Sequence, residues 1–410
     1  MDDHGHPATN HLPSETRPHA ATFMGWPPAG PVRGKWTAAV REDVVAIART
    51  IADHEPVVLL ASPQDAAGAR RACGGAAEVV ELPMDDLWLR DSGPVFVTGE
   101  DGTLSGIDFG FNGWGGKQEH SRDGLVARRL LEWAGVPRIE APLVAEGGSL
   151  ETDGDGTLLV TESSLVNDNR NPGRSRDDIE RTLTGLLGVR KVIWLPGVRG
   201  EDITDCHVDA LARFAGPATV LLSRPPVDTP AVWTRVYEEA RAALESATDA
   251  HGRTLEIIEL PEPEPAALGR RGPDFLGSYV NYYVANGAAV VPRFGDPGAP
   301  EVGGARNPAP PPPRPVGPAR NAPRDVLCAP LPRQPGGRAR GAPPPARPPP
   351  PPDEEAASII GSLHPGREVR TVDISALAEG GGGIHCATQQ RRPPLYRREA
   401  RPAGELRGPS

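Results

Sequence analysis

The chain has 410 residues, enough for one large domain or two ordinary ones, and a formal net charge of −10. This acidic balance excludes a general affinity for nucleic acid or for anionic membrane surfaces, and it favours cationic ligands. The first twenty residues are polar, and no later run approaches the ~20 apolar residues that a membrane-spanning helix needs. We therefore predict a cytoplasmic protein that partners neither nucleic acid nor a membrane.

The cysteines lack the close spacing that is typical of zinc sites and disulfide frameworks. They are scattered along the chain as Cys73, Cys206, Cys328 and Cys386. We expect no metal and no organic cofactor, so any chemistry must come from the side chains themselves.

The first regular elements are a helix over residues 35–54 and a buried strand over residues 57–60. The helix is predicted because Val40, Val44, Ile47 and Ile51 recur at helical spacing. From there a unit recurs: a short apolar strand, a loop with polar residues, a second strand and usually a helix.

The first strands of these units read EVVELP, RIEAPL, KVIWLP, EIIELP and EVRTVDI, beginning at residues 78, 138, 191, 256 and 368. The first four recur every 53 to 65 residues, and the last gap falls into line once residues 298–352 are removed. Because one such unit cannot bury its own apolar face, five of them predict a closed, pseudo-symmetric α/β array.

The segment 298–352 is foreign to this pattern, with 20 of the 49 prolines and eight arginines. Proline at this density favours an extended, solvated chain, so we predict an unstructured insertion, with a proline-rich docking segment as the alternative. The predicted organisation is a polar tail over 1–14, a single domain over 15–297 and 353–390, and a basic tail over 391–410.

Polar clusters follow the first strand in four units, and strand-end loops are the usual place for active sites. They are WLRDSGP with Trp88 and Asp91, EGGS with Glu146, DCHVD with His207 and Asp209, and GGGGIHC with Gly383 and Cys386. The remaining unit has DFLGSYVN, residues 274–281, in the corresponding place. If the units share one geometry, these loops meet at one end of the array.

Cys386 is the predicted nucleophile, because four glycines before it allow the main chain to approach a small substrate closely. Side-chain alternation on an extended segment would turn His207 and Asp209 together and Cys206 away, which makes Cys206 the poorer candidate. Asp91 and Asp209 near a thiol would raise its pKa unless the substrate is a cation. A guanidinium, which binds carboxylates through paired N–H groups, fits this arrangement.

The motifs WLRDSGP, EGGSLETDGDGT, HVDALARF and GGGGIHCATQQ, in this order, resemble those of the agmatine deiminase family, which includes bacterial-type peptidyl-arginine deiminases. ETRPHAATFMGWP and GSYVNYYVANGAAVVPRFGD resemble that family too. The resemblance spans roughly residues 15–297 and 353–390. It implies a five-bladed α/β-propeller, the pentein fold of guanidine-modifying enzymes, and a homo-oligomer.

The resemblance also implies an activity, the hydrolysis of agmatine to N-carbamoylputrescine and ammonia on the route to putrescine and the polyamines. It makes Cys386 the nucleophile and His207 the general acid and base. Asp91 and Asp209 would grip the guanidinium, while Glu146 assists there and orients His207. We also place Trp88, Trp114 and Gly383 at the substrate; Trp114 is either a wall for an aliphatic chain or a buried core residue.

Two departures from the family pattern bear on activity. Cys206 stands where the family usually has glycine, so a positive φ there would be strained, and residues 298–352 interrupt the last unit. The alternatives are therefore a deiminase for peptidyl-arginine or another small guanidine, a catalytically impaired guanidine-binding protein, and a proline-rich interaction module.

Overall fold

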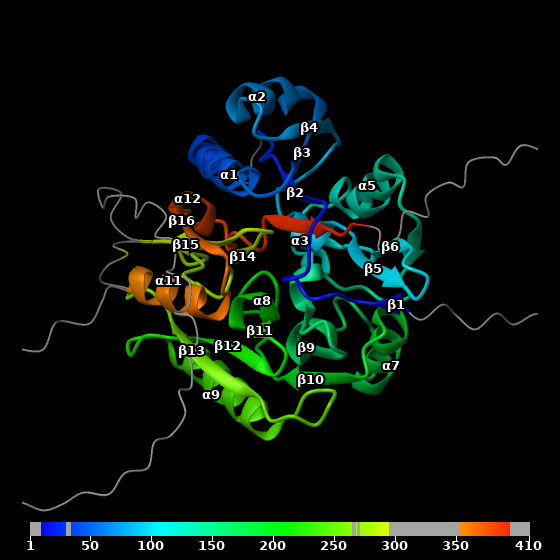
Figure 1. The fold of residues 1–410 in the computed structure, drawn as a ribbon, viewed down its shortest axis with the longest axis vertical. Helices are drawn as coiled ribbons and strands as arrows, with labels where there is room; N and C mark the ends of the chain where they lie inside the picture. Colours follow the sequence, from blue (N-terminus) through cyan, green and yellow to red (C-terminus); the bar gives the residue numbers. More distant parts are fainter. Residues whose placement is uncertain (1–9, 30–33, 265–267, 269–270, 295–351, 394–410) are drawn as a thin grey trace, which may run out of the picture.

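Five small sheets surround a central axis, with helices on the outside (Figure 1). The computed structural model describes residues 10–29, 34–264, 268, 271–294 and 352–393. Nearly all of the predicted insertion and basic tail lies outside the described residues. No helix in the described part of the chain is long and apolar enough to cross a membrane.

Each sheet repeats one pattern: an inner strand runs antiparallel to a middle strand, which pairs in parallel with an outer strand. The first three sheets in chain order consist of β1 (Asn10–His11), β5 (Val95–Gly99), β6 (Leu104–Asp108) and β7 (Arg138–Glu140); β8 (Glu151–Thr152), β9 (Thr157–Thr161) and β10 (Lys191–Leu195); and β11 (Ala212–Gly216), β12 (Thr219–Arg224) and β13 (Glu256–Pro261).

The last two sheets consist of β14 (Tyr283–Val284), β15 (Ala288–Arg293) and β16 (Glu368–Asp373); and β17 (Thr388–Arg391), β2 (Ala21–Gly25), β3 (Val57–Ala61) and β4 (Glu78–Glu81). All five strands that the sequence spacing singled out are the parallel edge strands β4, β7, β10, β13 and β16. The predicted five-bladed α/β-propeller is confirmed.

The ring closes through strands from opposite ends of the chain. Near the C-terminus, β17 pairs antiparallel with β2, and Thr388 lies opposite Met24. The closure fixes the position of Cys386, which lies two residues before β17. Two predicted boundaries also shift, because β1 lies within the predicted polar tail 1–14, and Arg391 and buried Arg392 lie within the predicted basic tail.

Helices pack their apolar faces on the outside of the sheets. The longer ones are α1 (Thr37–Ala52), α2 (Pro63–Cys73), α5 (Val126–Ala134), α7 (Arg176–Leu187), α9 (Ala231–Ser246) and α11 (Pro352–Leu363). In α1 the predicted apolar positions Val40, Val44, Ile47 and Ile51 are all buried, and β3 beside it is buried throughout. Both local predictions are confirmed.

Short helical turns follow the outer strands and lead the chain toward the axis. They include α3 (Leu89–Ser92), η3 (Gly147–Ser149), α8 (Val208–Leu211) and α12 (Ser375–Ala378). Others are η1 (Gly34–Trp36), α4 (Gly113–Gly116), η2 (Asp123–Leu125) and α6 (Glu162–Leu165). The η3 turn contacts both α3 and α8 near the centre, so the loops of separate sheets meet there.

Candidate active site

Loops from all five sheets meet at the axis of the ring. They contribute Asp91, Glu146, His207 with Asp209, Asn281, and Cys386 with His385, all of them buried. The predicted convergence of the loops therefore occurs, and it includes the DFLGSYVN loop, for which the sequence supplied no role.

Cys386 is held by Asn281 through two contacts. The Asn281 amide donates to Cys386 Sγ at 3.1 Å, and the Cys386 backbone N–H donates to Asn281 Oδ1 at 3.2 Å. The glycines before it make this fit possible, because a Cβ on Gly383 would lie 2.5 Å from Asn281 Oδ1. A Cβ on Gly382 would lie 2.4 Å from the Trp88 ring. The glycine run is thus pressed against the side chains of Trp88 and Asn281; the predicted close approach to a small substrate stays a prediction.

Asp209 lies between the thiol and a second histidine. Its Oδ2 accepts a hydrogen bond from His385 at 2.7 Å and lies 3.5 Å from Cys386 Sγ. Its Oδ1 is buried and has no hydrogen-bond partner among the described residues. A buried carboxylate oxygen without a donor is costly, so this atom indicates where a ligand would bind.

His207 lies between two carboxylates. Its Nδ1 is 3.6 Å from Asp91 Oδ1 and its Nε2 is 3.4 Å from Glu146 Oε2. Within the described chain, Nε2 makes no hydrogen bond. Gly148 leaves space for this packing, since a Cβ there would lie 2.8 Å from both Asp91 Oδ1 and His207 Nδ1.

Asp91 and Glu146 are themselves positioned by hydrogen bonds from residues outside the cavity lining. Asp91 accepts hydrogen bonds from Trp114 Nε1 at 2.9 Å and from the Gly148 backbone N–H at 3.1 Å. Trp114 has a φ of 55°, a left-handed conformation that is uncommon for a bulky residue and is found at functional sites. Glu146 accepts from Arg170 Nε at 2.7 Å.

Burial and charge shift the pKa values of the central groups. Burial would lower the pKa of His207, but Asp91, Glu146 and Asp209 raise it to about 9. Burial raises the pKa of the Cys386 thiol well above its usual range, and Asp209 and Asp91 raise it further. A bound cation would oppose that effect and favour the thiolate. A cation bound beside Cys386 would therefore make its thiol easier to deprotonate.

A cavity of about 490 Å³ opens from this cluster. His207, Asp209 and Cys386 line it, whereas Asp91 and Glu146 lie behind His207. Its size is that of an ordinary small-molecule site. Among the described residues no three His, Cys, Asp or Glu side chains are grouped so as to hold a metal ion.

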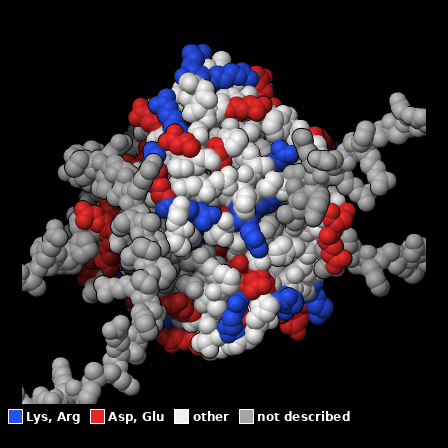
Figure 2. Space-filling model, viewed as in Figure 1, with Lys and Arg blue, Asp and Glu red and all other residues white. Residues whose placement is uncertain are grey.

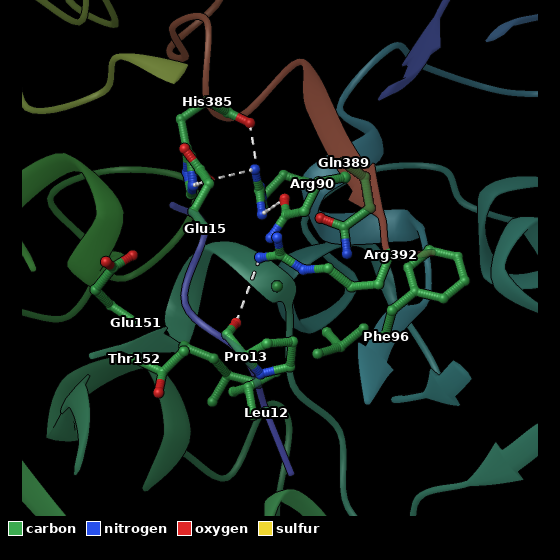
Figure 3. Close-up of a pocket in the computed structure, with 14 residues that line it drawn as sticks. Leu12, Pro13, Glu15, Arg90, Phe96, Glu151, Thr152, His385, Gln389 and Arg392 are labelled. Carbon is green, nitrogen blue, oxygen red and sulfur yellow. Dashed lines mark hydrogen bonds and ion pairs between the residues drawn. The ribbon is translucent and has the colours of Figure 1, made fainter. Parts of the chain in front are cut away.

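The far side of the cluster is closed by a charged network around Glu15. Figure 3 shows Glu15 beside His385 and Arg90 in a cavity of about 40 Å³. Glu15 Oε2 lies 2.9 Å from His385 Nε2 and 3.2 Å from an Arg90 nitrogen, and Glu15 Oε1 lies 3.0 Å from Arg213. Figure 2 shows Lys and Arg side chains near the middle of a face of the molecule, over the region of β17 and the N-terminal segment.

The sequence as a whole matches a known family. The model for the Porphyromonas-type peptidyl-arginine deiminases matches residues 11–302 and 348–392. A putative agmatine deiminase of Streptomyces coelicolor is 34% identical over 93% of this chain and 99% of the relative. The chain belongs to the Porphyromonas-type peptidyl-arginine deiminase family.

Other members of this family support the assignment. An agmatine deiminase of Medicago truncatula is 38% identical over 70% of this chain and 84% of its own length. The structure of the agmatine deiminase of Enterococcus faecalis superposes with a TM-score of 0.75 at 26% identity, covering 93% of this chain and 96% of that one. The family and fold implied by the sequence motifs are therefore confirmed.

Within this family member the predicted site residues fall into two groups. Cys386, His207, Asp209, Asp91 and Glu146 form one contiguous cluster. The residues placed at the substrate, Trp88, Trp114 and Gly383, are not among those that line the cavity. Trp114 instead bonds Asp91, while Trp88 and Gly383 pack at the glycine loop.

One step of the sequence argument needs correction. The residues after His207 are not extended, because Val208–Leu211 forms the helical turn α8; His207 and Asp209 both line the cavity all the same. Arg90, next to Asp91 in the chain, is buried and bonds Glu15.

Cys206 has the positive φ, 69°, that was expected to strain a non-glycine residue there. Its side chain packs in an apolar cluster with Leu159 and Phe214, and burial raises its pKa to about 12. Because the pKa of the Cys386 thiol is raised as well and both cysteines line the cavity, these values do not distinguish the two, and the weaker candidacy of Cys206 as nucleophile stays a prediction.

The sequence argument missed four residues of the cluster, namely Asn281, His385, Arg170 and Glu15. Asn281 could have been found, because it occupies the loop of the one unit to which no function was given. The contact of His385 with Glu15 joins residues 370 positions apart, and no local pattern relates them.

Proposed function

We propose that this chain hydrolyses agmatine to N-carbamoylputrescine and ammonia. The observation that carries the proposal is the buried Asp209, which has one oxygen beside Cys386 and one oxygen without a partner among the described residues. Three carboxylates surround one histidine here, so the cluster favours a bound cation. Agmatine deiminases among the relatives support a guanidinium as that cation.

Substrate binding prepares the nucleophile. The guanidinium carbon is placed next to Cys386 Sγ, with Asp209 and Asp91 accepting N–H bonds from its nitrogens. Asp91 does not line the cavity in this structure, so its contact requires the guanidinium to enter deeper, beside His207. Trp114 keeps Asp91 in place for this contact, and Asn281 holds the sulfur. The positive charge lowers the pKa of the thiol, which releases its proton to water, and the thiolate then attacks the guanidinium carbon.

Attack forms a carbon–sulfur bond and a tetrahedral intermediate. His207, protonated at neutral pH, donates its proton to one nitrogen of the former guanidinium, and that carbon–nitrogen bond breaks to release ammonia. A thiouronium group remains on Cys386. Glu146, itself held by Arg170, orients His207 for this step.

The second half of the reaction regenerates the enzyme. The now neutral His207 accepts a proton from water, and the hydroxide attacks the thiouronium carbon. The carbon–sulfur bond breaks and the hydroxyl proton passes to the departing sulfur, so that the carbonyl of the carbamoyl product forms and Cys386 returns as the thiol. No redox partner is required, since both half-reactions are substitutions at one carbon.

Two alternatives keep some support. The family name includes peptidyl-arginine deiminases, which would use the same cluster on arginine within a protein. The strained backbone at Cys206, next to His207, favours an impaired guanidine-binding protein. The homo-oligomer implied by the family resemblance stays a prediction.

A product assay separates these possibilities. The purified chain is incubated with agmatine, free arginine or an arginyl peptide, and ammonia and ureido product are measured. We expect turnover of agmatine, none in Cys386→Ser, and retained turnover in Cys206→Ser. Ureido product from the peptide alone would favour the peptidyl enzyme. Binding without any product would favour the impaired protein.

A further inference from the structure

The active-site cavity extends from the catalytic loop to a polar wall contributed by other sheets. Ser223 near the end of β12, Glu262 just after β13, and Ser278 before β14 line this part of it. The Ser278 hydroxyl donates to the backbone oxygen of Ala210 at 2.8 Å, one residue after Asp209. The wall and the catalytic cluster are therefore tied together within one cavity.

The Glu262 carboxylate is only half satisfied at this wall. Ser223 Oγ donates to Glu262 Oε1 at 2.8 Å. Its other oxygen has no partner among the residues that the structure describes, and the residue keeps some exposure toward the cavity. This leaves one carboxylate oxygen available to a group that enters the cavity.

Other carboxylates that line the cavity are already engaged or lie open to solvent. Asp202 accepts the backbone N–H groups of Thr204 and Cys206, and Glu379 accepts that of Gly272. Glu201 and Asp274 are exposed, where charge pairs are worth little. Asp86 accepts the Leu87 N–H through one oxygen and the Gln118 amide through the other. Apart from Asp209 in the catalytic cluster, Glu262 alone among the carboxylates that line the cavity is both sheltered and uncommitted.

We propose that Glu262 binds a primary ammonium group at the far end of the substrate, which selects amines that carry a guanidine over arginine and its peptides. This inference rests on the proposed function, and names what recognises the second end of the same substrate. An ammonium donates well to a carboxylate in a sheltered site. The α-carboxylate of free arginine would be repelled there, and an arginyl peptide has no cation at that position.

The electrostatics of the wall agree with a cationic ligand. Burial raises the pKa of Glu262 to about 7, with only the Ser223 hydrogen bond opposing it. An ammonium bound beside the carboxylate would favour its ionised form and lower that pKa. Affinity for a substrate with a terminal amine should therefore strengthen as pH rises through about 7, whereas a substrate without the amine should lack this dependence.

Binding to Cys386→Ser, measured by calorimetry at pH 8, tests the inference without turnover. The probes are agmatine and pentylguanidine, in which a methyl group replaces the ammonium. In Cys386→Ser/Glu262→Gln we expect agmatine to bind roughly tenfold to a hundredfold more weakly, as for loss of a charged hydrogen bond, and pentylguanidine to be unaffected. The matched control Asp274→Asn removes an exposed carboxylate from the same cavity and should change neither affinity.

Several outcomes would overturn the inference. They are equal weakening of both probes in Glu262→Gln, equal affinity of the parent for both probes, or the same selective loss in Asp274→Asn. Failure of the proposed function looks different: the wild-type chain would produce no ureido product from agmatine, although the binding selectivity remained. Unchanged melting temperatures in both variants exclude a folding defect as the cause.

Discussion

Charged groups are paired differently on the two sides of the loop that contains His385 and Cys386. On the far side, Glu15 is matched by Arg90, Arg213 and His385 within ion-pair or hydrogen-bond distance. On the cavity side, Asp209 and His207 each keep one atom without a hydrogen bond in the described chain. The same chain segment, residues 385–386, faces both. The comparison indicates that charges around Glu15 are paired within the protein. The negative charge on the cavity side is left for a cationic substrate to balance.

The largest expected effect on stability comes from the ion pairs around Glu15. Glu15→Ala leaves buried Arg213 and Arg90 without their shared carboxylate, and breaking a buried pair costs about 3–5 kcal/mol. Urea unfolding of wild type and variant measures the difference in the free energy of unfolding. Glu15→Gln, which keeps an acceptor for the Val284 N–H, should lose less. If Glu15→Ala lost no more free energy of unfolding than a variant of an exposed residue, such as Asp53→Asn, the stabilising role of the Glu15 ion pairs would be contradicted.

His207 should make a pH-dependent contribution to stability on the cavity side. Its folded pKa, about 9, lies above the ordinary value of 6.5, because three carboxylates favour the imidazolium against burial. A raised pKa means that this stabilisation is complete below pH 6.5 and is lost as pH rises through 9.

The measurement compares the unfolding free energies of wild type and His207→Asn between pH 6 and 10. We expect the difference to shrink across that range. A constant difference would show that His207 contributes through packing and not through its charge.

Asp91→Asn should separate activity from stability. Loss of a charged hydrogen bond to the guanidinium costs about 1.5–3 kcal/mol, so kcat/KM should fall roughly tenfold or more. Burial, with Asp209 and Glu146 adding to it, raises the pKa of Asp91, so its charge opposes folding at neutral pH. The free energy of unfolding should therefore stay the same or increase. If the variant lost both activity and stability, Asp91 would have a structural role like that of Glu15.

The sequence predicted the repeating fold better than the hydrogen bonds and ion pairs that connect the residues of the site. The edge strands β4, β7, β10, β13 and β16 each begin with a charged residue followed by Val or Ile, and they recur at a nearly constant interval once residues 298–352 are set aside, so they could be found together. The proposed catalytic residues could be found because each follows such a strand.

The supporting contacts could not be predicted in this way. Glu15 meets Arg213 and His385 only because the N-terminal segment crosses the axis, and Arg170 reaches Glu146 from an irregular loop before α7. Trp114 was expected either as a wall for an aliphatic chain or as a buried core residue. It is a buried core residue, and its indole N–H donates to Asp91. Such pairings depend on tertiary closeness and leave no periodic signal.

The smallest expected effect concerns residues 298–352, which lie almost wholly outside the described residues. Their flanks are close together, because the Phe294 backbone N–H donates to Asp353 Oδ1 at 3.2 Å. Deleting Gly298–Pro352 leaves residues 295–297 to join these positions, and three linking residues can span about 13 Å. Asp353, Glu354 and Glu355 would still supply acidic side chains to the first turn of α11.

Closing a long loop costs only a logarithmic term, so shortening this one should stabilise the chain by at most about 2 kcal/mol. We expect the deletion variant to melt at the same temperature as the full chain or slightly above it, to resist a brief protease digest better, and to keep the agmatine kcat/KM of the full chain. The insertion is thus expected to contribute neither to the stability of the domain nor to substrate binding. A marked drop in melting temperature would mean that the segment packs against the body, and a selective loss of activity would connect it to the cavity.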